Sequence, residues 1–195
     1  MSVLQANPFL LAGVGDDYEI ERSLRFNAGD SSFLNRTPSS AGNRKTYTLS
    51  AWVKLSNVAA TQHHLFASNN TYICFTNAGK IEVNLRGGSS ANYFSTSNAV
   101  FRDFSSFFHL VWRVDTANSS MKIYINGEEI TFSSSSVPSN ADTDINRNAQ
   151  HNIGKSTIDP RYFDGYLADV HFIDGQALAP TDFGETDDNG VWQPK

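Results

Sequence analysis

Apolar and polar side chains alternate along two consecutive stretches in the middle of the chain, residues 107–115 and 121–126. One face of these stretches is apolar throughout: Phe108, Leu110, Trp112, Val114, Met121, Ile123 and Ile125. An alternation with period two predicts β-strands that bury one face. Asn126-Gly127 follows the second stretch and favours a two-residue type I′ hairpin, because both positions of that turn need positive φ. We therefore predict three consecutive antiparallel strands here.

The same alternation recurs along the chain. Residues 46–55 give the clearest further strand, with Tyr47, Leu49, Ala51 and Val53 on one face. Shorter strands are predicted over residues 20–26, 33–34, 63–66, 71–76, 80–85, 93–95, 151–154 and 162–173. Strands at intervals of roughly 8–12 residues, separated by turn residues, indicate a sandwich instead of an α/β fold. We expect an all-β, antiparallel jelly-roll sandwich of two sheets, with one helical turn within residues 177–183.

Composition divides the chain into three parts. Residues 1–18 are predicted to form an N-terminal arm, residues 19–185 the β-sandwich, and residues 186–195 a C-terminal tail. The arm carries several apolar side chains: Val3, Leu4, Phe9, Leu10 and Leu11. Because such side chains are costly to leave in water, we expect the arm to dock against a partner or a neighbouring copy. The alternative is a disordered terminus.

The charge balance excludes one class of partner. Fifteen Lys and Arg stand against twenty Asp and Glu, for a net charge of -5, and the cations are not clustered. A protein that tracks nucleic-acid phosphates would show a basic patch. No apolar run reaches the roughly 18 residues that a membrane span needs. We therefore predict neither nucleic-acid binding nor membrane insertion, and we interpret the single cysteine, Cys74, as a small buried hydrophobe.

The carboxylates do not form the pattern of a glycosidase. A retaining glycosidase needs two carboxyl groups about 5–5.5 Å apart. Glu128 and Glu129 are adjacent and therefore point to opposite faces of a strand, and Asp164 and Asp169, five positions apart, also face apart. No Ser-His-Asp arrangement has local support in the sequence either. We predict that the chain is not an enzyme.

Glycan binding would use an exposed aromatic ring together with amide and carboxylate hydrogen bonds. The predicted loops and strand ends offer side chains of these types: Asn92, Tyr93, Phe94, Asn146, Asn148, Asp159 and Tyr162. Aromatic residues at strand ends also pack into the core or around its rim. The sequence therefore leaves the glycan-binding residues unknown.

Four sequence blocks, taken in order, resemble the concanavalin A-like lectin/glucanase superfamily in its laminin-G-like or pentraxin-like branch. The blocks lie within residues 24–34, 47–54, 108–127 and 163–178. The resemblance implies a jelly roll of two antiparallel sheets. Related domains often hold a structural calcium ion between the first turn and the last strand, which here implies Asp30 and Asp169. Calcium takes six to eight oxygen ligands, so carbonyls and water would complete the shell. Ala168 stands where the pentraxin-like branch commonly carries a carboxylate, which weakens this expectation.

The opening and the end of the chain resemble, more narrowly, a set of bacteriophage proteins with a laminin-G-like domain. The residues concerned are 16–26 and 34–37, and then 162–170 and 189–192. Such proteins are virion components. The resemblance implies a non-enzymatic protein on the virion surface, as a capsid (head) decoration or a tail fibre. It would contact other virion proteins, form a homo-oligomer such as a trimer, and attach to host-surface glycans. The alternative is a free-standing carbohydrate-binding lectin or adhesin module, with calcium as a cofactor in one variant.

Overall fold

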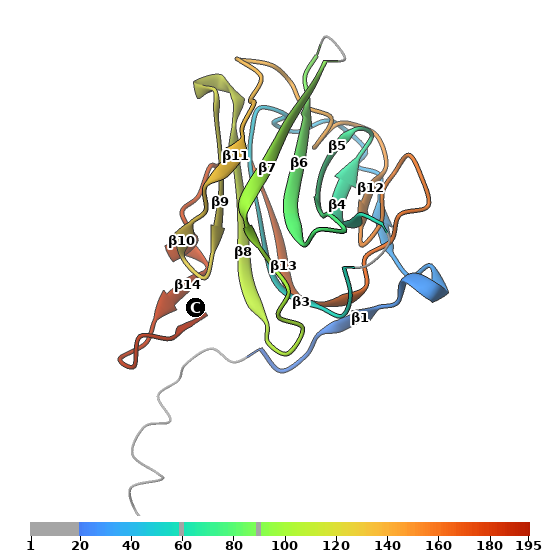
Figure 1. The fold of residues 1–195 in the computed structure, drawn as a ribbon. Helices are drawn as coiled ribbons and strands as arrows, with labels where there is room; N and C mark the ends of the chain where they lie inside the picture. Colours follow the sequence, from blue (N-terminus) through green and yellow to red (C-terminus); the bar gives the residue numbers. More distant parts are fainter. Residues whose placement is uncertain (1–19, 59–60, 89–90) are drawn as a thin grey trace, which may run out of the picture.

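The computed structural model describes residues 20–58, 61–88 and 91–195, and these residues form two antiparallel β-sheets that pack face to face (Figure 1). The predicted N-terminal arm, residues 1–18, lies outside the described residues. The six-stranded sheet has the order β1 (Leu24–Phe26), β13 (Gly165–Asp174), β3 (Thr46–Leu55), β8 (Phe108–Asp115), β9 (Ser120–Ile125) and β10 (Glu128–Glu129). The predicted all-β sandwich is confirmed.

The second sheet has seven strands. Its order is β11 (Phe132–Ser134), β7 (Asn92–Val100), β6 (Lys80–Arg86), β5 (Thr71–Phe75), β4 (His63–Ser68), β12 (His151–Ile153) and β2 (Leu34–Arg36). In the part of the chain that the structure describes, three single turns of 3-10 helix join strands: η2 (Ala28–Asp30), η3 (Thr116–Asn118) and η4 (Pro180–Asp182). No helix among the described residues has the length and apolar character needed to cross a membrane.

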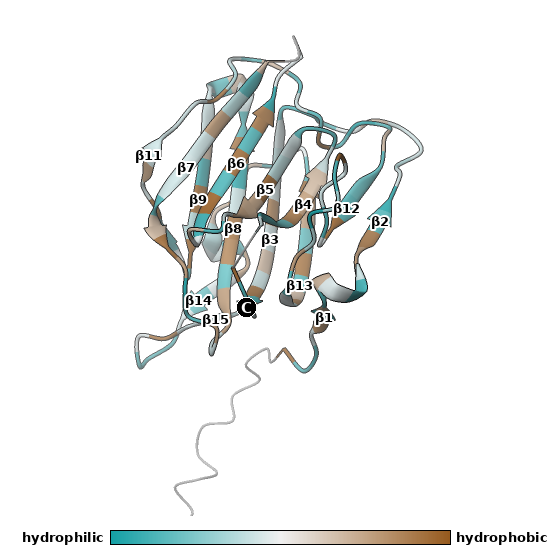
Figure 2. Ribbon diagram, turned by 45° about the vertical axis from the view of Figure 1, so that its right-hand side comes forward, coloured by the Kyte–Doolittle hydropathy of each residue, from teal (hydrophilic) through white to brown (hydrophobic). Residues whose placement is uncertain are grey.

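The core lies between the two sheets and is built from the predicted alternating positions. Figure 2 shows hydrophobic and hydrophilic bands alternating along β6. The predicted inward residues of β3 and β8, including Tyr47 and Trp112, join one hydrophobic cluster with Phe75 and Ile81 of the opposite sheet. The rings of Tyr47 and Trp112 meet edge to face, with centroids 5.7 Å apart. Cys74 is buried, as predicted, and burial raises the pKa of its thiol.

The predicted hairpin turn is present between β9 and β10. Ile125 pairs with Glu128, so Asn126 and Gly127 form the loop, with φ values of 48° and 84°. These two positive φ values are those of a type I′ turn. A Cβ atom on Gly127 would lie 2.5 Å from the indole of Trp192, so this position requires glycine for space as well as for its backbone conformation.

The start of the first predicted strand was wrong. The first strand was predicted over residues 20–26, but β1 begins at Leu24, where its pairing with β13 starts at Leu167. Residues of the predicted C-terminal tail, 186–195, belong to a second hairpin, in which β14 (Gly184–Thr186) pairs with β15 (Trp192–Pro194). This hairpin places Trp192 against the outer face of the six-stranded sheet, where its ring stacks on His109.

Candidate functional site

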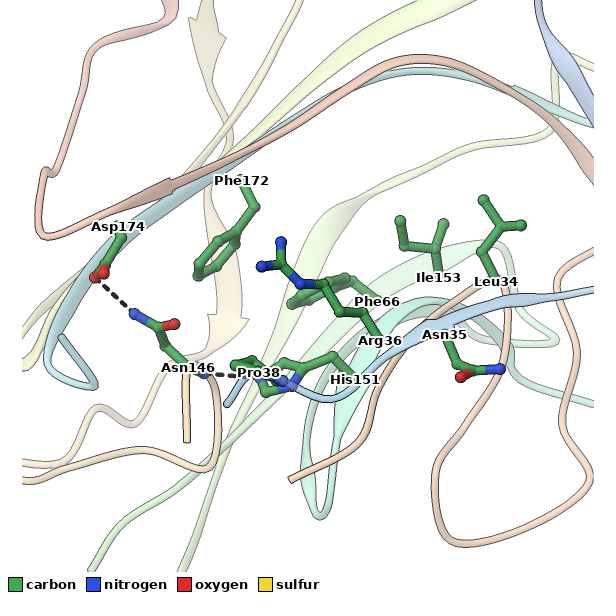
Figure 3. Close-up of a pocket in the computed structure, with 10 residues that line it drawn as sticks. All are labelled: Leu34, Asn35, Arg36, Pro38, Phe66, Asn146, His151, Ile153, Phe172 and Asp174. Carbon is green, nitrogen blue, oxygen red and sulfur yellow. Dashed lines mark hydrogen bonds between the residues drawn. The ribbon is translucent and has the colours of Figure 1, made fainter. Parts of the chain in front are cut away.

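A pocket of about 440 Å³ lies where the β2 edge of the seven-stranded sheet approaches β13 of the six-stranded sheet (Figure 3). Strands β2, β4, β12 and β13 supply most of its walls, the loop after β2 supplies Pro38, and the loop before β12 supplies Asn146. The lining residues are Leu34, Asn35, Arg36, Pro38, Phe66, Asn146, His151, Ile153, Phe172 and Asp174. The pocket is preformed and is large enough for a small ligand, since such sites span roughly 300–1,000 Å³.

Strand register places the apolar lining in one row. Ile153 of β12 pairs with Leu34 on one side and with Phe66 on the other, so these three side chains follow one another across three strands. Phe172 reaches the same space from β13, and its ring stacks on that of Phe66 with centroids 5.6 Å apart and an interplanar angle of 22°. The result is an aromatic and aliphatic floor that belongs to both sheets.

The polar end of the pocket is fixed by Asn146 and Asp174. The Asn146 side-chain amide donates hydrogen bonds to Asp174 Oδ1 at 2.6 Å and to the Asn43 carbonyl at 3.1 Å. The backbone N–H of Asn43 donates to the same Asp174 oxygen at 2.8 Å. A Cβ atom on Gly42 would lie 2.3 Å from both the Asn146 amide nitrogen and Asp174 Oδ2, so only glycine lets the loop approach this closely. Figure 3 shows this pair at one end of the pocket.

His151 is held as a neutral ring in the pocket wall. Its Nε2 accepts a hydrogen bond from the backbone N–H of Asn146 at 2.8 Å. Its Nδ1 therefore carries the proton and donates to the carbonyl of Ala149, also at 2.8 Å. Burial lowers the pKa of His151, which keeps the ring uncharged at neutral pH.

Arg36 stands next to His151 across the β2–β12 pair, and its side chain lies on the pocket side. Figure 3 shows its guanidinium extending over the pocket towards Phe172. Among the described residues, this guanidinium has no hydrogen-bond or ion-pair partner, Asp174 included. The pocket therefore combines an apolar floor with one unpaired cation and one hydrogen-bonded carboxylate.

A second pocket, of about 300 Å³, lies on the outer face of the six-stranded sheet. Its lining residues are Ser50, Trp52, His109, Asp169, His171, Asp182, Phe183 and Lys195. Ser50 Oγ lies 2.8 Å from His109 Nε2, but Nδ1 of the same ring accepts a hydrogen bond from the Trp192 indole at 3.1 Å. His109 Nε2 therefore carries the proton and donates to Ser50, so in this tautomer it cannot act as a general base towards the hydroxyl.

The structure does not bring the two predicted calcium ligands together. β1 and β13 are antiparallel, with Phe26 opposite Gly165 and Leu24 opposite Leu167. Asp30 comes after the Phe26–Gly165 end of the strand pair, whereas Asp169 comes after the Leu24–Leu167 end. The two carboxylates therefore lie at opposite ends of the pair. Asp30 is exposed and accepts a hydrogen bond from Asn27 at 2.6 Å, whereas Asp169 lines the second pocket with a φ of 44°. Within the described ranges, no group of three or more His, Cys, Asp or Glu side chains could hold a metal ion.

The seven side chains considered for glycan binding separate into three regions. Asn146 lines the pocket between the sheets, and Asn148 lies in the same loop, where its amide donates to the Ser39 carbonyl. The β7 residues Asn92, Tyr93 and Phe94 lie on the other half of the seven-stranded sheet, where Phe94 is 46% exposed. Asp159 and Tyr162 belong to the loop between β12 and β13, where Asp159 pairs with Arg161.

Sequence reasoning missed most of the pocket. Phe66, Phe172 and Asp174 lie on or beside predicted strands, but the pocket exists only because β12 joins β4 to β2. Strand order across a sheet has no signal in local periodicity. Arg36 could have been noticed as a cation on a short edge strand, without any indication of its neighbours.

The family model described as "Concanavalin A-like lectin/glucanases superfamily" (Laminin_G_3) matches residues 27–182. This match covers most of the chain, and the chain therefore belongs to this superfamily, with a laminin-G-like domain. No match is found among curated protein sequences.

Solved structures share the fold. A native heptameric SAP-like pentraxin from Limulus polyphemus matches with 15% identity and a TM-score of 0.51, over 74% of this chain and 70% of that one. The CBM40 of the Ruminococcus gnavus IT-sialidase matches with 16% identity and a TM-score of 0.52, over 78% and 96%. A leech intramolecular trans-sialidase complexed with 2,7-anhydro-Neu5Ac matches with 18% identity and a TM-score of 0.54, over 78% of this chain and only 27% of the enzyme. At these identities the likeness shows the fold alone.

Proposed function

We propose that this domain binds carbohydrate and that the pocket between β2, β4, β12 and β13 receives the sugar. The observation that carries the proposal is the shared floor of Phe66 and Phe172 with Asn146 and Asp174 at one end. A sugar ring has an apolar C–H face and an edge of hydroxyl groups. The floor would contact that face, while the amide and carboxylate oxygens would accept hydroxyl hydrogen bonds.

The comparisons support this class of ligand. Among the proteins with the same fold, one is crystallised with 2,7-anhydro-Neu5Ac and another is a module of a sialidase. Cell entry of a botulinum neurotoxin of type C, which is similar in fold with 13% identity and a TM-score of 0.50, depends on interaction with two ganglioside molecules. Fold alone does not fix function, so the proposal depends on the residues that line the pocket.

The proposal is a binding role without catalysis. The tautomer of His109 leaves Ser50 without a base, and the carboxylates Glu128 and Glu129 both lie on the short exposed strand β10. A domain of this kind needs only affinity and a surface location. We do not assign it calcium dependence, since Asp30 and Asp169 are not neighbours.

The narrower role that we propose is host attachment on a virion surface, on the capsid or the tail. It rests on the resemblance of residues 16–26 and 162–170 to bacteriophage proteins, and a sugar pocket is what attachment to host glycans requires. In this role, residues 1–18 and a homo-oligomer such as a trimer would fix the domain to other virion proteins. A chain without residues 1–18 that binds particles normally would contradict this part of the proposal.

Binding to a glycan array, followed by calorimetry with the best sugar, tests the carbohydrate proposal. Phe172→Ala removes half of the floor and should weaken binding at least tenfold, while Leu34→Ala, at a residue that is 47% exposed, should weaken binding less and leave stability unchanged. Phe94→Ala is the matched control, because Phe94 is an exposed aromatic residue outside the pocket. Thermal melting verifies that each variant is folded.

The pattern of losses identifies the site. Loss of binding in Phe172→Ala and Leu34→Ala with normal binding in Phe94→Ala supports the pocket. Loss in Phe94→Ala alone would move the site to the outer face of the seven-stranded sheet. No binding of any sugar by the wild-type chain would remove the carbohydrate proposal.

A further inference from the structure

We infer that the saccharide recognised by this pocket is acidic, and that one anionic group on it, a carboxylate or a sulfate ester, pairs with Arg36. This inference rests on the proposed function and adds the chemical class of the ligand. The position of Arg36 and the hydrogen bonds of the polar groups around it support this inference.

Strand register fixes the position of Arg36. In β2, Leu34 and Arg36 are two residues apart and therefore point to the same side of the sheet, which is the pocket side. Leu34 continues the apolar row through Ile153, and Arg36 stands opposite His151. The guanidinium extends over the floor towards Phe172 in Figure 3. A ligand that rests on this floor would come within reach of its N–H donors.

The donors of His151 and Asn146 are already in use. Both ring nitrogens of His151 are hydrogen bonded, and the ring is neutral. The Asn146 amide donates to Asp174 and to Asn43. The nearby Arg147 pairs with Asp144 at 3.0 Å and does not line the pocket. Arg36 is therefore the charged donor in this pocket that lacks a partner among the described residues.

An unpaired guanidinium at a pocket selects for a planar or tetrahedral anion. Its fork of N–H groups matches the two oxygens of a carboxylate, and charge-assisted hydrogen bonds of this kind are stronger than neutral ones. Because Arg36 is exposed, the gain is smaller than for a buried pair. We expect a preference of roughly threefold to tenfold for the acidic sugar over its neutral counterpart, which corresponds to about 1 kcal/mol.

Asp174 limits the charge of the ligand. Its carboxylate lines the same pocket as Arg36 without pairing with it, so a second negative charge on the ligand would be repelled. The whole chain carries a net charge of -5, which also opposes highly charged anions. These charges favour a sugar with one anionic group over a phosphate monoester, and they leave Asp174 to accept hydrogen bonds from sugar hydroxyls.

The test uses sugars that differ in one group. Methyl glucuronide, methyl glucoside and methyl glucoside 6-sulfate, with the galacto series in parallel, are titrated into the wild-type chain and into Arg36→Gln and Arg36→Lys. Arg102→Gln is the control, because Arg102 is exposed and lies outside the pocket. This substitution removes the same positive charge as Arg36→Gln. We expect Arg36→Gln to abolish the acidic preference, Arg36→Lys to keep part of it, and Arg102→Gln to keep all of it.

The results separate this inference from the proposed function. A wild-type chain that binds neutral and acidic sugars equally, through a pocket that Phe172→Ala disrupts, overturns the acidic inference and leaves carbohydrate binding in place. The acidic inference is also overturned if Arg36→Gln keeps the preference for acidic sugars, or if Arg102→Gln loses as much of that preference as Arg36→Gln does. The uronate and sulfate arms show which anion is bound, and preferred binding of glucose 6-phosphate would contradict the role given to Asp174.

Discussion

The indole nitrogen of Trp192 donates a hydrogen bond to Nδ1 of His109 across 3.1 Å, and the two rings stack with centroids 6.0 Å apart. Trp192 comes from the C-terminal hairpin and His109 from the outer face of β8. Because His109 Nε2 also bonds to Ser50, both ring nitrogens are occupied and the ring is held neutral. This contact attaches the last residues of the chain to the six-stranded sheet.

We expect Trp192→Phe to lower the free energy of unfolding by about 1–2 kcal/mol. The phenyl ring keeps the stacking contact, but Nδ1 of the buried His109 loses its donor, and an unsatisfied buried acceptor costs about this much. Urea denaturation measures the change. Trp52→Phe is the control, since Trp52 also stacks on His109 but makes no hydrogen bond to it. Equal losses in the two variants would show that the hydrogen bond contributes nothing.

Stability should fall as the pH decreases from about 6.5 to about 4. Burial, with a smaller effect of the His171 charge, lowers the pKa of His109 to about 4, and burial likewise lowers the pKa of His64 to about 4. In the unfolded chain both groups take up a proton near pH 6.5. Protons therefore favour the unfolded state in this window, and stability is fully present only above it.

Each of these two histidines contributes up to about 3 kcal/mol to the pH dependence. Unfolding free energies measured by urea from pH 7.5 to pH 4 give the total slope, and His109→Gln removes the part that belongs to His109 while retaining a polar side chain. A slope that is unchanged in His109→Gln would contradict the neutral, buried state described for this ring.

Alanine substitutions at three glycines distinguish the cost of backbone strain from the cost of a steric clash. Gly127 has a φ of 84° and its added Cβ would meet Trp192 at 2.5 Å, Gly190 has a φ of 80° with open space, and Gly88 has open space without positive φ. We expect Gly127→Ala to destabilise most, Gly190→Ala by about 1–2 kcal/mol from strain alone, and Gly88→Ala hardly at all. Thermal denaturation ranks the three, and equal effects at Gly127 and Gly190 would mean that Trp192 moves aside.

Much of the fold could be predicted from sequence because its strands bury one face. β3 was predicted with both boundaries correct. The inward residues of β8 and β9, where period two is strong, all belong to the hydrophobic cluster or pack against it. The C-terminal hairpin was missed because β14 and β15 have three residues each. An alternation of apolar and polar residues cannot be recognised over so short a stretch. Trp192 of this hairpin donates a hydrogen bond to His109, a contact between distant parts of the sequence.

The pocket was much less predictable than the sheets. Asn146 was considered as a polar loop residue. In the structure it has a φ of 60° and donates a hydrogen bond to Asp174, at a place where the backbone of Gly42 lies very close to both side chains. The paired calcium ligands were taken from a family pattern, and the antiparallel register of β1 and β13 separates them. Side chains that meet through register and strand order cannot be found from local sequence.

We expect the melting temperature to be the same with calcium and with a chelator. Asp30 and Asp169 do not share a site, so Asp30→Asn and Asp169→Asn should each change stability only locally. Asn tolerates the left-handed backbone of Asp169, which makes this variant conservative. A calcium-dependent rise in melting temperature that either variant abolishes would contradict this expectation and restore the calcium site.

The most direct test of carbohydrate binding in this pocket is a crystal structure of the chain soaked with the sugar that binds best in solution. We predict density for a sugar ring on Phe172, with its anionic group at Arg36 and a hydroxyl group within hydrogen-bond distance of Asp174. Density for the sugar beside Phe94, with this pocket empty, would contradict the central claim.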